Sequence, residues 1–155
     1  MQKCVEISTK SDKDTKAVGE ILARSLMEDG PRKVATLVSL EGDLGAGKTT
    51  FVQGFAKGLG IKEIPKSPTF VLMKIFRIPG KKGRKHFENL IHMDVYRISA
   101  RDLNALEWSD FSKNPANLIL VEWGGRIKKA FSKKVLRVIF EHGKNEKERI
   151  LRIQE

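Results

Sequence analysis

One eight-residue stretch, at positions 42–49, limits what this chain can fold into more than any other feature. Its letters, GDLGAGKT, fit the phosphate-loop pattern G-x-x-x-x-G-K-[ST] at every required position. Such a loop joins a strand to a helix, because its backbone N–H groups and the helix N-terminus together hold the phosphate oxygens. An apolar run at 34–40 precedes the loop, and helix-like apolar spacing at Phe51, Val52 and Phe55 follows it. We therefore predict a nucleoside triphosphate site here, in preference to a glycine-rich turn that only caps a helix.

The side chains of this loop predict separate roles within one site. Lys48 is expected to reach the β- and γ-phosphates and is counted as catalytic, while the Thr49 hydroxyl is expected to ligate Mg²⁺. The predicted nucleotide contacts are Gly42, Asp43, Leu44, Gly45, Ala46, Gly47, Lys48, Thr49 and Thr50.

Length and composition are those of an ordinary globular protein. The 155 residues predict a single domain over 1–155, long enough to bury a core of its own. No apolar stretch approaches the roughly 18 residues of a membrane helix, and the first residues lack the apolar segment of a signal peptide. We therefore expect a cytoplasmic protein without membrane contact. Cys4 is the only cysteine, which excludes an internal disulfide and a cysteine-based metal site.

The chain is strongly basic, with 30 Lys and Arg against 19 Asp and Glu and a formal net charge of +11. This charge favours anionic partners, whether nucleotide, nucleic acid or an acidic protein surface. We interpret the two basic clusters as solvated surface, because neither lies in a recognisable nucleic-acid module or alternates with aromatic residues. The clusters are residues 81–86 and, further on, Arg126, Lys128, Lys129, Lys133, Lys134 and Arg137.

Hydrophobic periodicity predicts a continuous α/β arrangement. A strand at 4–7 precedes a helix at 13–27, which Ser11 or Asp12 caps and whose core face is Ala17, Val18, Ile21, Leu22, Ser25 and Leu26. Further strands are predicted at 34–40, 71–78, 89–96 and 117–123, a helix from 99 or 100 to 111, and an edge hairpin joining 134–141 to 148–153. This order predicts a three-layer α/β/α P-loop NTPase fold, with a mainly parallel central sheet and antiparallel edge strands.

Two of these strands end in carboxylates. Asp94 shares one side of strand 89–96 with His92 and Tyr96, and Glu122 closes the next apolar strand in a Walker-B-like pattern. Such carboxylates can hold Mg²⁺ or activate the attacking water. We assign both to the metal site, with Asp94 preferred as metal ligand and Glu122 as catalytic carboxylate, and leave the direct ligand open. A Glu122 paired with a surface lysine is the alternative, and His92 is expected to be packed or hydrogen-bonded, because Mg²⁺ prefers oxygen.

A short segment after the phosphate-loop helix, Lys66-Ser67-Pro68-Thr69-Phe70, leads into the next predicted strand. Pro68 biases Ser67 toward an extended conformation, so a loop is expected there. The Thr69 hydroxyl is predicted to be catalytic as a switch threonine, which touches the γ-phosphate or Mg²⁺ and orders the loop when a triphosphate is bound. By composition alone, the same residues are typical of an ordinary turn.

Taken in order, these motifs resemble the TsaE (YjeE) family of small bacterial ATPases. The resemblance rests on the phosphate loop and on Ser67-Pro68-Thr69-Phe70, His92-Met93-Asp94-Val95-Tyr96-Arg97 and Val121-Glu122-Trp123. It implies ATP and Mg²⁺ as cofactors, and an ATPase that supports a TsaB–TsaD threonylcarbamoyl-transferase complex acting on adenosine 37 of tRNA. It also implies the phosphate, switch and metal roles given above, and it places Thr15, near the start of the first helix, close to the nucleotide base.

The chain departs from the family pattern in two places. Gly124-Gly125 follow the Glu-Trp pair where the family usually has Pro-Glu, and the basic insertion at 81–85 exceeds what the family leads us to expect. This insertion could contact a partner or tRNA directly. Two further alternatives stay open: a nucleotide-gated protein-binding switch with little turnover, and a small-molecule kinase, although a kinase needs an acceptor pocket and usually an arginine-bearing lid.

Overall fold

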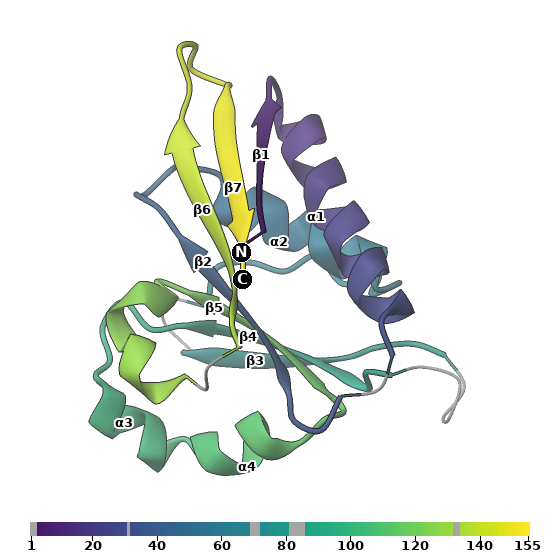
Figure 1. Ribbon diagram of the computed structural model, residues 1–155, viewed down its shortest axis with the longest axis vertical. Helices are drawn as coiled ribbons and strands as arrows, with labels where there is room; N and C mark the ends of the chain where they lie inside the picture. Colours follow the sequence, from purple (N-terminus) through teal and green to yellow (C-terminus); the bar gives the residue numbers. More distant parts are fainter. Residues whose placement is uncertain (1–2, 31, 69–71, 81–85, 132–133) are drawn as a thin grey trace.

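Seven strands of the chain form one sheet, and helices cover both of its faces (Figure 1). The computed structural model describes residues 3–30, 32–68, 72–80, 86–131 and 134–155. The strands are β1 (Cys4–Thr9), β2 (Thr36–Glu41), β3 (Met73–Arg77), β4 (Asn89–Asp94), β5 (Asn117–Glu122), β6 (Leu136–His142) and β7 (Arg149–Gln154). The helices are α1 (Asp12–Glu28), α2 (Lys48–Gly58), α3 (Ala100–Ala105), α4 (Trp108–Lys113) and the 3₁₀ helix η1 (Gly124–Ala130).

The strand order is β1-β7-β6-β2-β5-β4-β3. The central strands β6, β2, β5 and β4 run parallel, while β3, β7 and β1 are added antiparallel, which confirms the predicted parallel centre with antiparallel edges. The predicted edge position of the C-terminal hairpin is wrong. Strand β6 pairs with β2 inside the sheet, and β1 forms the edge beyond β7, with Cys4 opposite Gln154. Because this pairing joins the two ends of the chain, no local pattern in the sequence could indicate it.

Helices α1 and α2 pack together on one face of the sheet, at the distance that glycine allows. A Cβ on Gly54 would lie 2.0 Å from the carbonyl oxygen of Lys16, and one on Gly19 would lie 2.3 Å from that of Phe51. Of the two predicted caps, Ser11 is the one used, since its hydroxyl accepts the Asp14 N–H at 3.1 Å.

The predicted core face of α1 is partly wrong. Ala17, Ile21 and Ser25 are exposed, Ile21 by 67%, whereas Leu26 is buried as predicted. The helix also buries Thr15, Gly19 and Ala23, which the pattern did not indicate. The face turned inward is the one with small residues, because only these let α2 approach so closely.

The other face of the sheet is covered by α3, α4 and η1 (Figure 1). The single helix predicted from 99 or 100 to 111 is broken, because Glu107 adopts a left-handed conformation with φ 56°. The break lets Trp108 turn inward, where its indole Nε1 donates to the Ala130 carbonyl at 3.3 Å. Neither glycine nor proline marks this point, so the sequence did not indicate it.

Side chains of the central strands alternate between two apolar clusters, one on each face of the sheet. Val38, Leu40, Leu118 and Leu120 pack toward α1 and α2. Leu37, Ile119 and Val121 pack toward α3, α4 and η1. A strand buried on both faces reads as a continuous apolar run, which explains the sequence pattern of β2 and β5. The three-layer α/β/α prediction is confirmed.

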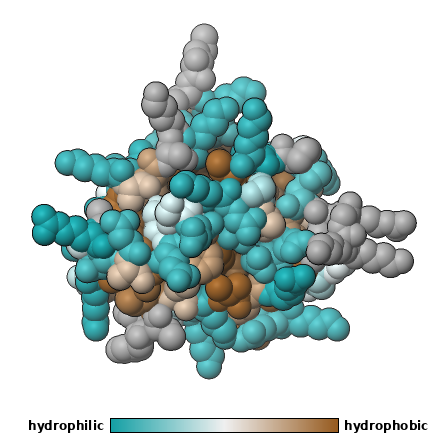
Figure 2. All heavy atoms as spheres, turned by 90° about the horizontal axis from the view of Figure 1, so that it is seen from below, coloured by the Kyte–Doolittle hydropathy of each residue, from teal (hydrophilic) through white to brown (hydrophobic). Residues whose placement is uncertain are grey.

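The outer surface is mostly hydrophilic on the face shown in Figure 2, where apolar areas are small and separate. In the part of the chain that the structure describes, no helix is both long enough and apolar enough to cross a membrane.

Candidate nucleotide site

The phosphate loop lies at the carboxyl end of β2, between this central strand and α2. Gly47 is the N-cap of α2 and has a φ of 104°, a left-handed conformation that residues with a Cβ rarely adopt. Because β5 and β4 run parallel to β2, their carboxyl ends reach the same edge of the sheet. The predicted strand, loop and helix are therefore present, and the predicted carboxylates lie beside them.

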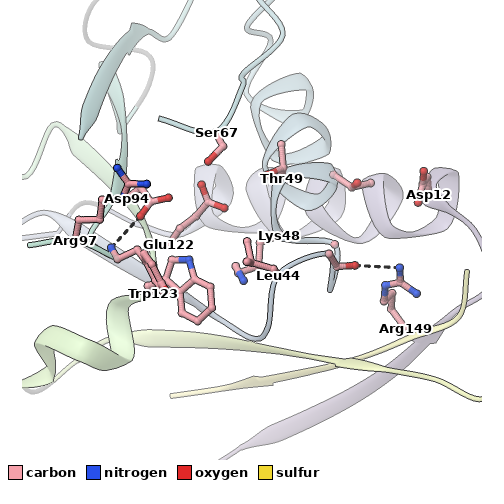
Figure 3. A pocket seen from close by; sticks show the side chains of 14 residues that line it. Asp12, Leu44, Lys48, Thr49, Ser67, Asp94, Arg97, Glu122, Trp123 and Arg149 are labelled. Carbon is pink, nitrogen blue, oxygen red and sulfur yellow. Dashed lines mark hydrogen bonds between the residues drawn. The ribbon is translucent and has the colours of Figure 1, made fainter. Parts of the chain in front are cut away.

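A cavity of ≈ 480 Å³ opens at this edge of the sheet (Figure 3). Its wall combines the phosphate loop, the start of α2, the ends of β4 and β5 with the residues after them, and three residues from elsewhere in the chain, Asp12, Ser67 and Arg149. The lining residues are Asp12, Leu44, Gly45, Gly47, Lys48, Thr49, Thr50, Ser67, Asp94, Tyr96, Arg97, Glu122, Trp123 and Arg149. This volume is of the size expected for a small-molecule ligand site.

Lys48 is 6% exposed and turns back onto its own loop. Its Nζ donates to the carbonyl oxygens of Gly42 and Asp43, the latter at 3.0 Å, and lies 4.1 Å from the centre of the Trp123 ring. Burial lowers the pKa of Lys48, and the negative charges of Glu122, Asp43 and Asp94 oppose this effect. The ammonium group is thus held by weak neutral acceptors that a phosphate could replace.

The two predicted carboxylates lie side by side in the cavity. Asp94 and Glu122 are register partners on the parallel strands β4 and β5, and they are 5% and 3% exposed. The Asp94 carboxylate accepts the Tyr96 N–H at 2.9 Å, which orients it at the end of its strand.

The donors facing this cavity suit Mg²⁺. Together with the Thr49 hydroxyl, Asp94 and Glu122 offer oxygen ligands, which Mg²⁺ prefers. Among the residues described, no group of three or more His, Cys, Asp or Glu side chains could hold a metal by itself. Mg²⁺ is typically bound by one or two carboxylates together with waters and substrate phosphates, so the donor set fits that kind of site.

Glu122 has a buried partner. Its Oε2 lies 2.8 Å from Nε2 of His92 on the neighbouring strand. The alternative of an edge Glu122 paired with a surface lysine is wrong, because β5 is an inner strand between β2 and β4 and the glutamate is buried. The prediction that His92 is a hydrogen-bonded strand residue is confirmed.

A pair of aromatic rings, tilted by 55° to each other, forms part of the cavity wall, a role that the sequence pattern did not predict. The Trp123 ring lies 4.9 Å from that of Tyr96, and the Arg126 guanidinium lies 5.0 Å from the centre of the Tyr96 ring. Trp123 has a φ of 63°, and this left-handed turn directly after Glu122 directs the indole over Lys48. The signal available in the sequence was the tryptophan next to the acid.

Arg149 is a second residue that the sequence reading missed. It begins β7, yet its Nη2 donates to the Gly45 carbonyl of the phosphate loop at 3.1 Å (Figure 3). Its Nη1 donates to the carbonyls of Glu146 and Glu148 at 2.6 and 2.9 Å. Only the three-dimensional pairing of the C-terminal hairpin with β2 brings this cation to the loop.

Some predicted site residues do not line the cavity. Thr15 is buried behind Gly47, where its hydroxyl lies 2.8 Å from that of Thr9, and its predicted place near the base stays a prediction. Gly42, Asp43 and Ala46 belong to the loop but not to the cavity wall. Thr69 lies outside the described residues, while Ser67 of the same predicted switch segment lines the cavity.

A glycine loop between a central parallel strand and a helix, with two carboxylates at the same sheet edge, is the arrangement of a P-loop NTPase fold. The crystal structure of Bacillus subtilis YdiB has this fold too: it matches with a TM-score of 0.74 and 30% identity, over 99% of this chain and 86% of that one. The chain belongs to the TsaE family, whose model, described as "Threonylcarbamoyl adenosine biosynthesis protein TsaE", matches residues 9–151.

Named relatives support this membership. The tRNA threonylcarbamoyladenosine biosynthesis protein TsaE of Bacillus subtilis is 35% identical over 146 residues, which cover 90% of this chain and 80% of that protein. The protein of the same name from Aquifex aeolicus is 35% identical over 130 residues, covering 77% of this chain and 87% of its own length.

Proposed function

We propose that this chain binds and hydrolyses ATP with Mg²⁺, and that hydrolysis supports the formation of threonylcarbamoyladenosine at position 37 of tRNA. The observation that carries the proposal is the convergence of Lys48, Thr49, Asp94 and Glu122 on one cavity at the carboxyl edge of the sheet. The family and the names of its members support the link to tRNA modification. Adenine as the base rests on the family, and the sequence carries no Asn-Lys-x-Asp motif for guanine.

The residues of the cavity suit an in-line attack by water on the γ-phosphorus. Lys48 leaves the Gly42 and Asp43 carbonyls for the phosphates, while loop N–H groups and the α2 N-terminus hold the remaining oxygens. Glu122 accepts a hydrogen bond from the attacking water and takes its proton, as the water oxygen forms the new bond to phosphorus and the bond to the ADP oxygen breaks. Bound Mg²⁺ would supply charge neutralisation at the β- and γ-phosphates, with Thr49 and Asp94 on its protein side.

The proposed partner is a TsaB–TsaD-like threonylcarbamoyl-transferase pair that stimulates the hydrolysis. Direct tRNA contact through the basic clusters stays a prediction, because residues 81–85 and Lys133 lie outside the described residues. Arg137, assigned to the second cluster, is half-buried and paired with Glu41. Its Nε and Nη2 donate to the two oxygens of Glu41 at 2.9 and 2.6 Å.

A second candidate is a nucleotide-gated switch with little turnover. The aromatic pair favours it, because Lys48, Trp123, Tyr96 and Arg126 form a chain of contacts from the phosphate loop to the exposed Tyr96. Movement of Lys48 onto a phosphate would change its contact with the Trp123 ring, which is the first contact of this chain.

Phosphate release separates these two functions. The purified chain with Mg-ATP is measured alone and with the TsaB–TsaD-like pair, and Lys48→Ala is measured beside it. An ATPase that serves this pair releases phosphate faster in its presence, and the variant does not. Nucleotide-dependent binding of the pair without phosphate release would replace hydrolysis by the switch. Phosphorylation of another molecule in place of release would identify a kinase.

A further inference from the structure

We propose that His92 is a positioning residue, which holds the Glu122 carboxylate in the orientation that hydrolysis requires. The inference deepens the proposed function and rests on it. Its starting point is the hydrogen bond between His92 Nε2 and Glu122 Oε2, at 2.8 Å. The two side chains are 0% and 4% exposed, so solvent does not compete for this bond.

The place of His92 on its strand sets it between the core and the cavity. Leu90, His92 and Asp94 alternate along β4 and so lie on the same face of the sheet. Leu90 belongs to the apolar cluster beneath α1 and α2, whereas Asp94 lines the cavity. The imidazole therefore lies between the apolar core and the cavity, and its Nε2 contacts Glu122 on the neighbouring strand β5.

In the described part of the chain, the imidazole makes one hydrogen bond, to Glu122, and this bond indicates what the residue does. His92 Nδ1 is buried and has no hydrogen-bond partner among the described residues. Buried polar atoms nearly always have partners, so a ring that served only to fill the core would be an expensive choice at this position. A neutral imidazole has one N–H, and it must lie on Nε2 to donate to the carboxylate. The unfavourable burial of Nδ1 is therefore explained if the hydrogen bond from Nε2 to Glu122 is needed for function.

The bond defines how the carboxylate is presented. With Oε2 held by the imidazole, Oε1 is the oxygen that accepts from the attacking water. A buried glutamate without this donor would have freedom to rotate and would lose a hydrogen bond to a charged group. Catalytic groups held loosely lose rate even when the substrate still binds. His92 therefore acts on the rate through Glu122 and does not itself contact the nucleotide.

The test compares His92→Leu, which removes the donor, with His92→Gln, whose amide nitrogen can donate in its place. Single-turnover hydrolysis of Mg-ATP by the 155-residue chain is measured with the TsaB–TsaD-like pair present, and ATP affinity is measured on the chain alone. We expect the single-turnover rate constant to fall roughly 10- to 100-fold in His92→Leu and to recover at least in part in His92→Gln, with the Kd for ATP changed less than about threefold. His142→Leu, at an exposed histidine of β6, serves as the matched control and should leave both values unchanged.

The same substitution in a Glu122→Gln background separates this inference from the proposed function. If His92 acts through Glu122, His92→Leu adds no further loss of rate to Glu122→Gln. Equal, additive losses in both backgrounds, or an unchanged rate in His92→Leu, would overturn the positioning role. Wild-type chain that fails to hydrolyse ATP even with the TsaB–TsaD-like pair present, or a Glu122→Gln variant as fast as wild type, would instead overturn the proposed function. Thermal unfolding identifies a variant that fails to fold. If His92→Leu does not fold, the hydrolysis rate of a normally folded His92→Gln is compared with that of the wild-type chain in both backgrounds.

Discussion

Lys48 is the residue on which ligand binding depends most directly. It is a buried cation whose donors are taken up by two loop carbonyls and whose ammonium lies against the Trp123 ring. Burial lowers its pKa, so the charged form is less stable here than in water. A phosphate that enters the loop would stabilise the charged ammonium by hydrogen bonds, in place of the water that burial removes.

Lys48→Ala should abolish the stabilisation of the fold by ATP. For the unmodified chain, Mg-ATP at 100 times its Kd contributes about 2.7 kcal/mol, which corresponds to a rise in Tm of roughly 5–10 °C for a domain of this size. A thermal-shift measurement with and without Mg-ATP checks this. The exposed Lys57 of the same helix provides the control, and Lys57→Ala should keep the full shift. An equal shift in Lys48→Ala would contradict the phosphate-loop assignment.

At the scale of elements, the site depends on how closely α2 can approach α1. Gly19 and Gly54 remove the side chains that would separate the two helices, and α2 carries Lys48 and Thr49 at its first turn. The same requirement explains why the predicted face of α1 was partly wrong. Hydrophobic periodicity favoured Ile21, but a large side chain at the contact would push α2 and the phosphate loop away from α1.

Gly54→Ala should destabilise the fold by about 2–3 kcal/mol, because its methyl group would overlap the backbone of Lys16. Urea denaturation followed by circular dichroism measures the free energy of unfolding. Gly30→Ala is the matched control, since a Cβ there meets nothing within 4 Å and should change stability by no more than about 0.5 kcal/mol. Equal stabilities for both variants would show that the helices can separate at no cost.

The pair between Glu41 of β2 and Arg137 of β6 joins two central strands beside the phosphate loop. Burial alone would raise the pKa of Glu41, but the hydrogen bonds from Arg137 and Ser39 outweigh it and hold the pKa below its ordinary value. The folded protein therefore binds a proton at this carboxylate less readily than the unfolded chain does. Its contribution to stability is present above the ordinary carboxyl pKa and is lost as the pH falls through the lowered value.

Glu41→Gln should accordingly lower the free energy of unfolding at pH 7 by about 1.5–3 kcal/mol, the range for hydrogen bonds to a charged group. The difference between the variant and the unmodified chain should shrink as the pH falls below about 4.5, where the unfolded carboxylate is protonated. Urea denaturation across the range from pH 7 to pH 3 gives this difference. A gap that stays constant down to pH 3 would show that the carboxylate charge is not what stabilises the pair.

At the scale of the whole molecule, the sheet gathers distant parts of the chain at one edge. Asp12, the phosphate loop, the ends of β4 and β5, and Arg149 meet at the same cavity (Figure 3). The two ends of the chain lie side by side because β1 pairs with β7 (Figure 1). The site thus depends on the complete order of the strands and not on the phosphate loop alone.

Much of this arrangement could be predicted from local sequence. The loop motif, the apolar runs of β2 and β5 and the acids that end β4 and β5 each carry their own signal, and the structure brings them together. Arg149 and the His92–Glu122 bond could not be predicted, because they depend on which strands become neighbours. The break at Glu107 was missed because it serves the burial of Trp108, which only tertiary packing determines.

Hydrolysis by Glu122 is the central claim, and single-turnover phosphate release by Glu122→Gln tests it most directly. The substitution keeps the size of the side chain but removes the carboxylate that receives the hydrogen bond of the attacking water. We predict that phosphate release from Mg-ATP falls by at least about 100-fold, while the Kd for ATP changes less than about threefold. Release at the rate of the unmodified chain would contradict the account.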